Sequence, residues 1–236
     1  MTAYEYLKQQ NAERLDCLAI DSEVGCYTYQ ELFAQIDATA TALWSMGIRK
    51  EKNVLAMFPA LPHESFLFYG IDAVGSALCQ IAPHYTATEV CNFANQITAD
   101  LFFVFDFILT LEMEQMVYKN TRVRHIIVVN VMPLQKRDKR TITWKEFVEQ
   151  GKDTTLPEIH RDTANDVLFF ASTGGTTGEP KHVMLSDNSF NHATHQYINS
   201  PLIYRVGQKC LRLWAIYTGA ASFANHHTIS DFLWML

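Results

Sequence analysis

Short apolar runs recur along the chain at a nearly constant interval, and this rhythm constrains the fold more than any other feature. The runs begin at residues 53, 77, 101 and 125 and are rich in Val, Ile, Leu and Phe. Each interval between two runs has the length and the apolar pattern of one helix. Strands that alternate with helices form right-handed crossovers and a parallel sheet covered on both faces. The sequence therefore predicts an α/β fold with a mostly parallel sheet flanked by helices.

Helix starts are marked by four Thr-x-x-Glu capping boxes, in which the Thr hydroxyl and the Glu carboxylate satisfy free N–H groups. The four boxes are Thr2/Glu5, Thr28/Glu31, Thr86/Glu89 and Thr143/Glu146. The helix after Thr28 places Leu32, Ile36, Ala40 and Leu43 on one face, and Gly47 is expected to end it. Further helices are expected over 63–74, 88–97, 107–120 and 143–150, with loops over 132–140 and 151–165.

The composition of the 236 residues is that of an ordinary globular protein, with 48% hydrophobic and 19% charged residues. These values exclude disordered and collagen-like chains, and the length suits one or two domains. The net charge of −6 comes without a basic stripe, so we expect no nucleic-acid partner. The short basic run Lys136, Arg137, Lys139 and Arg140 is interpreted as a solvated loop.

The five cysteines include no C-x-x-C pair, which predicts reduced thiols rather than a disulfide framework. We expect Cys79 and Cys91 to be core thiols. The N-terminus has no apolar leader segment, and the most apolar run, 101–111, contains Asp106 and is too short to cross a bilayer. The sequence therefore predicts a protein of the cytoplasm without a membrane span.

The segment from Ser172 to Lys181 combines glycine, threonine and lysine between two apolar stretches, 167–171 and 183–185. Glycines let the backbone approach a ligand closely, and successive N–H groups form an anion-binding nest. Threonine hydroxyls add donors, and Lys181 adds a positive charge. The order of residues fits neither a Walker A loop nor G-x-G-x-x-G. Composition alone leaves two interpretations open, a polyphosphate site and an ordinary turn between strands.

The order of these residues resembles the phosphate loop of the acyl-adenylate-forming superfamily, [ST]-[SG]-G-[ST]-[ST]-G-x-P-K-G. Residues 173–181 match this pattern throughout, and His182 stands where glycine is usual. The residues that the resemblance assigns to cofactor binding are Thr173, Gly174, Gly175, Thr176, Thr177, Gly178 and Lys181. The resemblance also makes Lys181 the catalytic candidate.

Two upstream stretches, 28–48 and 73–90, are also similar to the superfamily, the second through Gly75 and Pro83. Superfamily motifs that lie further along are not found: a Y-G-x-T-E sequence, the ribose-binding Asp and the small C-terminal domain with its lysine. In addition, Thr218 follows Tyr217 where a Phe-His pair is usual. The resemblance therefore predicts that residues 1–236 form an incomplete N-terminal AMP-binding domain, without the C-terminal half and the small domain.

The resemblance implies ATP-dependent activation of a small carboxylic acid to acyl-AMP, followed by transfer to a thiol. ATP with its Mg²⁺ is the implied cofactor, and coenzyme A or the phosphopantetheine of a carrier protein is the implied acceptor. Two alternatives stay open: a non-catalytic fragment with weak nucleotide binding, and an unrelated phosphate-binding α/β module.

The nine histidines raise the question of a metal site. His192 and His195 lie three residues apart in an expected helix, and His226 and His227 are adjacent. No cysteine or carboxylate stands at a recognised ligand spacing from them. We interpret the first pair as a helix-surface pair and predict no metal held by protein ligands.

Overall fold

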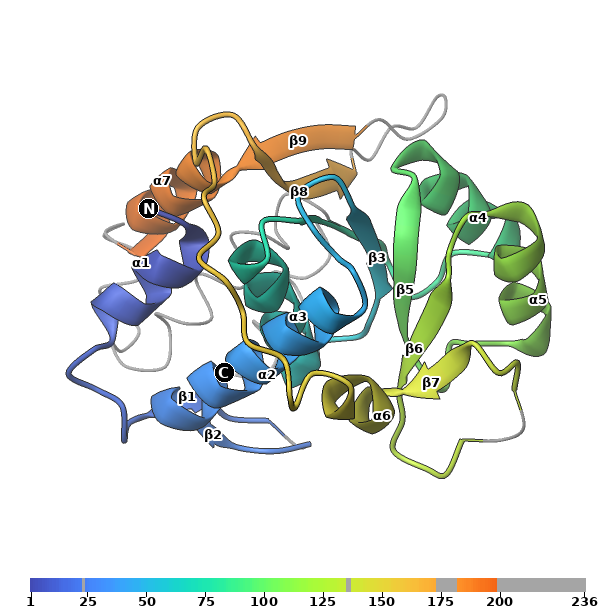
Figure 1. Ribbon diagram of the computed structural model, residues 1–236, viewed down its shortest axis with the longest axis horizontal. Helices are drawn as coiled ribbons and strands as arrows, with labels where there is room; N and C mark the ends of the chain where they lie inside the picture. The colour runs from blue at the N-terminus through green and yellow to red at the C-terminus, as the bar shows by residue number, and fades with distance from the viewer. Residues whose placement is uncertain (23, 135–136, 173–181, 199–236) are drawn as a thin grey trace. The chain divides into compact units, whose positions relative to one another are not determined.

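The computed structural model describes residues 1–22, 24–134, 137–172 and 182–198 (Figure 1). The chain divides into two compact units. One unit is formed by residues 35–160, and the other by residues 1–34 together with the segment that begins at Arg161.

The unit of residues 35–160 is built on five parallel strands in the order β7-β6-β5-β3-β4. The strands are β3 (Asn53–Met57), β4 (Ala77–Gln80), β5 (Ala99–Phe105), β6 (His125–Val129) and β7 (Thr141–Thr143). Four consecutive residues of β5, 101–104, are fully buried, so both faces of the sheet are covered. The predicted parallel α/β sheet is confirmed.

Helices cover both faces of this sheet (Figure 1). They are α2 (Tyr29–Ser45), whose residues from 35 onward belong to this unit, α3 (Pro62–Ala73), α4 (Ala87–Gln96), α5 (Leu111–Asn120) and α6 (Trp144–Glu149). In this unit α4 and α5 lie side by side on one face, and α2, α3 and α6 lie on the other. Each helix that leads from one strand to the next thus contributes to the covering of the sheet, as the strand–helix rhythm predicts.

Local capping chemistry starts the helices where the sequence predicts. Both hydrogen bonds of the capping box form at Thr2, Thr86 and Thr143. Thr28 forms the same pair, because its N–H donates to the Glu31 carboxylate and its hydroxyl accepts from the Glu31 N–H. Gly47, with φ +80°, lies just beyond the end of α2, in the left-handed region that glycine adopts without strain.

The basic run at 136–140 differs in part from its interpretation as a solvated loop. Lys136 lies outside the described residues, and Arg140 is solvent-exposed and paired with Asp138. The Arg137 side chain is only 13% exposed, lies 4.0 Å from the buried Glu114 carboxylate and donates to the carbonyl of Leu109. The interpretation was wrong for Arg137, because a buried acid on α5 gives this arginine a partner inside the unit.

The other unit contains α1 (Ala3–Gln10), β1 (Leu18–Ile20), β2 (Tyr27–Thr28), β8 (Val167–Ser172), β9 (His182–Ser186) and α7 (Asp187–Ile198). Both of its strand pairs, β1 with β2 and β8 with β9, are antiparallel. Within this unit α1 packs on α7. The short strands β1, β2 and β7 were not predicted.

The four cysteines among the described residues are free thiols, with Cys79 and Cys91 buried as expected. No helix in the described part of the chain has both the length and the apolar character needed to traverse a lipid bilayer.

Candidate functional site

The antiparallel pair β8–β9 carries the strand ends that flank the predicted phosphate loop (Figure 1). Ser172 at the end of β8 lies opposite His182 at the start of β9. All seven predicted binding residues, Thr173, Gly174, Gly175, Thr176, Thr177, Gly178 and the catalytic candidate Lys181, lie outside the described residues. Their predicted roles stay predictions, and the described part of the site is the framework from which they extend.

A buried ion pair holds the other end of this strand pair. Nε of Arg161 lies 2.6 Å from Oδ2 of Asp187, the first residue of α7, and the side chains are 1% and 0% exposed. The second carboxylate oxygen, Oδ1, accepts a hydrogen bond of 2.9 Å from the backbone N–H of Ala3. Asp187 therefore joins the N-terminal segment, the segment before β8 and the start of α7.

Backbone contacts reinforce the same end. Val167 lies opposite Ser186, and the N–H of Asn188 donates to the carbonyl of Thr163 at 2.9 Å. The turn before β8 is closed by Asp162, whose N–H donates to the Asp166 carboxylate. The strand pair is thus fixed at the end remote from residues 173–181.

The Arg161–Asp187 pair was missed by the reasoning from sequence. Arg161 stands in the stretch 151–165, which is expected to be a loop, and Asp187 lies 26 residues further along, beyond the predicted phosphate loop. Their pairing is long-range, and no local motif marks it. The sequence offers one indication: Asp187 stands close to an apolar strand, and a charged residue that is buried there needs a partner.

His182 occupies the position where the resembling loops have glycine. Its ring centroid lies 6.3 Å from that of Phe170 on the paired strand, and partial burial lowers the pKa of His182 below its usual 6.5. Partial burial therefore favours the neutral form of this imidazole. The next residues on β9, Val183 and Met184, are 45% and 65% exposed, although their apolar sequence suggests burial.

The upstream stretch 73–90 begins at the end of α3, turns at Gly75 and continues through β4 to the start of α4, in the unit of residues 35–160. Gly75 has φ +72°, and its N–H donates to the carbonyl of Asp72 at 2.9 Å. Pro83 follows the carboxyl end of β4, the side of a parallel sheet where α/β proteins usually bind ligands. At that end the Gln80 amide donates to the buried carboxylate of Glu64 on α3.

The histidine pair on α7 is a surface pair, because His192 and His195 are both exposed. His226 and His227 lie outside the described residues. Within the residues that the structure describes, no group of three or more His, Cys, Asp or Glu side chains is arranged to hold a metal ion.

Solved structures with the same fold include an apo structure of MbtA from Mycobacterium smegmatis, with a TM-score of 0.73 and 22% identity. The match covers 85% of this chain and 37% of that one. A structure of the anthranilate CoA ligase AuaEII in complex with anthranoyl-AMP gives a TM-score of 0.71 at 15% identity, over 84% and 37% of the two chains. These likenesses show the fold.

Among curated proteins, 4-coumarate–CoA ligase 3 of Oryza sativa subsp. japonica is 28% identical over 212 residues, 86% of this chain and 36% of the relative. A crotonobetaine/carnitine–CoA ligase of Escherichia coli (strain K12 / DH10B) is 21% identical over 221 residues, 89% and 42% respectively. The chain thus spans about two fifths of these relatives or less. The family model for AMP-binding enzymes matches residues 7–225, nearly the whole sequence, and the chain therefore belongs to the AMP-binding enzyme family.

Proposed function

We propose that this chain supplies the phosphate-holding part of an AMP-forming acid–thiol ligase. The observation that carries the proposal is the family match over residues 7–225, which includes the complete loop pattern at 173–181. In the proposed reaction a carboxylate oxygen attacks the α-phosphorus of ATP. The bond from that phosphorus to the bridging oxygen breaks, and acyl-AMP and pyrophosphate form. A thiol of coenzyme A or phosphopantetheine then takes the acyl group and releases AMP.

The role proposed for the loop is electrostatic. Its backbone N–H groups and the hydroxyls of Thr173, Thr176 and Thr177 hold the β- and γ-phosphates, and Lys181 neutralises part of their charge. The same groups stabilise the negative charge that develops on the departing pyrophosphate. Mg²⁺ is proposed to arrive bound to the ATP phosphates, which is its usual way of binding in such sites.

The substrate class proposed is a small carboxylic acid. Support comes from the relatives, because the names of the 4-coumarate and the crotonobetaine/carnitine proteins both describe ligases that join such a compound to coenzyme A. A carrier protein is the alternative acceptor.

A second candidate is a nucleotide-binding segment that does not turn over by itself. The observation that favours it is the coverage of 36% and 42% of the two relatives. Alignment of the acid, the α-phosphate and Mg²⁺ supplies much of the rate of such a reaction. Without the groups that align the acid and Mg²⁺, a phosphate clamp supplies affinity for ATP but little acceleration. Acid-dependent AMP formation by purified residues 1–236, free of any longer ligase, separates the two candidates: turnover supports the complete reaction.

The phosphate role is tested with Lys181→Ala. Removal of a charge-assisted contact is expected to weaken ATP binding about tenfold or more and AMP binding little, because the contact is made to the β- and γ-phosphates. Titration calorimetry with both nucleotides measures the two affinities. Lys145→Ala, which changes an exposed lysine on α6, is the matched control and is expected to bind both like the parent chain. Equal losses for ATP and AMP in Lys181→Ala contradict the assignment.

A further inference from the structure

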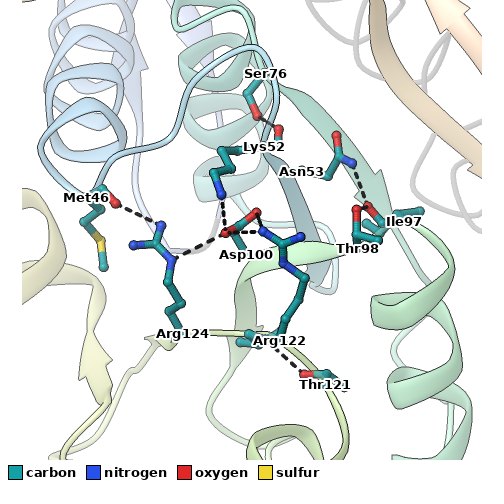
Figure 2. Close-up of polar contacts among 11 residues, drawn as sticks. Met46, Lys52, Asn53, Ser76, Ile97, Thr98, Asp100, Thr121, Arg122 and Arg124 are labelled. Carbon is teal, nitrogen blue, oxygen red and sulfur yellow. Dashed lines mark hydrogen bonds and ion pairs between the residues drawn. The ribbon is translucent and has the colours of Figure 1, made fainter.

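Three cationic side chains surround a single buried carboxylate at the amino ends of three neighbouring strands (Figure 2). Asp100 is the second residue of β5, the strand between β3 and β6. Lys52 immediately precedes β3, and Arg122 and Arg124 precede β6. The parallel arrangement therefore brings cations from both neighbouring strands to the acid on the middle one.

The contacts converge on one oxygen atom. Oδ1 of Asp100 lies 3.1 Å from Nζ of Lys52, 3.2 Å from Nη2 of Arg122 and 3.5 Å from Nε of Arg124. Oδ2 accepts a hydrogen bond from Nη2 of Arg122 at 3.2 Å. Because the three nitrogens share one oxygen, they lie within about 7 Å of one another, a range at which like charges repel strongly in a partly buried site.

The cluster carries more positive charge than its acid neutralises. Among the described residues, Asp100 is the only carboxylate that forms an ion pair with Lys52, Arg122 or Arg124. Three cations and one carboxylate leave a charge of +2, in a chain whose net charge is −6. One cation balances the charge of a buried carboxylate, so charge balance alone does not explain the other two.

The three cationic side chains are more exposed to solvent than the carboxylate that they surround, as a binding site for a soluble anion requires. The Asp100 side chain is 3% exposed, whereas those of Lys52, Arg122 and Arg124 are 32%, 50% and 44% exposed. Arg124 also donates to the carbonyl of Met46, which holds its guanidinium in place. The carboxylate lies between the three cations (Figure 2), and the partial exposure of Lys52 and Arg122 leaves part of each side chain accessible to a ligand.

We propose that Lys52, Arg122 and Arg124 form a binding site for a phosphate dianion. A dianion balances the excess charge of +2, and guanidinium groups match the geometry of phosphate oxygens while lysine adds a point charge. The site lies at the amino ends of the strands, opposite the edge where parallel sheets usually hold their substrates. It is therefore an accessory site, and it does not rest on the function proposed for residues 173–181.

The test uses the full chain and inorganic phosphate as the probe. A ligand that binds only the folded state raises the unfolding temperature. We expect phosphate to raise it more than sodium chloride at equal ionic strength, and calorimetry to give a phosphate affinity that falls about tenfold in Arg122→Gln and in Lys52→Gln. Arg140→Gln changes an exposed, paired arginine elsewhere in the unit and is expected to leave the affinity unchanged.

The variant that best distinguishes a phosphate site from a structural cluster is Asp100→Asn. It removes the competing carboxylate and raises the local charge to +3, so phosphate is expected to bind about tenfold more tightly and to restore stability that the variant loses. If the cluster has a structural role only, phosphate and chloride should have equal effects on the parent chain and on the variant. If Asp100→Asn does not fold, the two single-cation variants give the same comparison.

Additional arms identify the source of the phosphate and the location of binding. Pyrophosphate and AMP, titrated in the same way, show whether the group is preferred free, as a diphosphate or as a nucleotide ester. Phosphate binding that is lost in Lys181→Ala but kept in Arg122→Gln would place the anion at residues 173–181 and overturn the proposal. Equal effects of phosphate and chloride on the parent chain would also overturn it.

Discussion

The imidazole of His63 stands edge-on to the indole of Trp144, with 4.9 Å between ring centroids and 89° between ring planes. The ring of Phe66 packs against the same imidazole, with 5.6 Å between the ring centroids. In this apolar setting, burial lowers the pKa of His63 from 6.5 to about 4. Nδ1 is buried without a hydrogen-bond partner among the described residues. His63 is therefore neutral in the folded protein at pH 7.

This burial predicts a loss of stability in mild acid. Between pH 6.5 and about 4 the unfolded chain binds a proton at His63 that the folded chain does not, so the free energy of unfolding falls as the pH falls through this window. The full effect is about 3 kcal/mol. Urea unfolding at pH 7 and pH 4.5 measures it. His63→Phe keeps an aromatic ring and is expected to lose less stability over the same interval; an equal loss in both proteins would contradict the assignment.

Breaking the Arg161–Asp187 pair is expected to destabilise the protein strongly. Arg161→Met leaves the Asp187 carboxylate buried and without its cation, which costs about 3–5 kcal/mol. In Arg161→Met/Asp187→Asn both charges are gone while Asn keeps an acceptor for the Ala3 N–H, so much of that loss is expected to be recovered. Arg140→Met, at an exposed pair, is the control and should cost about 1 kcal/mol or less. A change below about 1 kcal/mol in Arg161→Met would be inconsistent with a buried pair.

Two glycines are expected to resist substitution for different reasons. A Cβ on Gly151 would lie 2.8 Å from Cα of Ala42 in α2, so Gly151→Ala forces backbone apart and should cost about 1–3 kcal/mol. A Cβ on Gly47 meets nothing within 4 Å, but its φ of +80° makes Gly47→Ala cost about 1–2 kcal/mol.

Asparagine separates these two causes. It tolerates the left-handed region, so Gly47→Asn is expected to be milder than Gly47→Ala, whereas Gly151→Asn is expected to be worse than Gly151→Ala. Thermal or urea unfolding of the four variants gives the order. The same order at both sites would refute the distinction.

The last prediction concerns the loop glycines. If Gly178 lies against phosphate, Gly178→Val should weaken ATP binding, because a branched side chain blocks the close approach of the backbone. The strand pair β8–β9 is held at its other end by Arg161 and Asp187, so the stability of the protein should change little. Gly175→Val is expected to behave similarly. ATP titration and urea unfolding read the two effects separately, and unchanged ATP affinity in Gly178→Val would argue against a backbone nest.

The features that could be predicted from the sequence are those that depend on residues close together in the chain. The strands β3 to β6 were predicted because residues buried on both faces leave a continuous apolar run, and the helix starts because a capping box is complete within four residues. The order of the strands was not predicted. Apolar parallel strands, such as those that contain Val54 and Ile127, have similar sequences, and these do not specify which strands pair. The antiparallel direction of β9 relative to β8 also depends on strand pairing, which the local amino-acid sequence does not specify.

The buried charged residues in both units were missed for a different reason. Arg161, Glu114 and Asp100 are charged, and a charged residue in a sequence is expected at the surface. Each is buried with a partner distant in sequence, which no local pattern reveals. The predicted binding residues at 173–181 are the converse case, in which a local motif predicts a site through the order of its residues.

The bond between the Ala3 N–H and Asp187 spans 184 residues, and this separation has a consequence for the nascent chain. At about 5–20 residues per second, the ribosome needs roughly 10–40 s to make the acceptor after the donor. Residues 35–160 form a unit that is complete in sequence and is synthesised within this interval. The strands β1 and β2 can pair early, whereas α1 can make its contacts with Asp187 and α7 only after residues 35–160 have been synthesised.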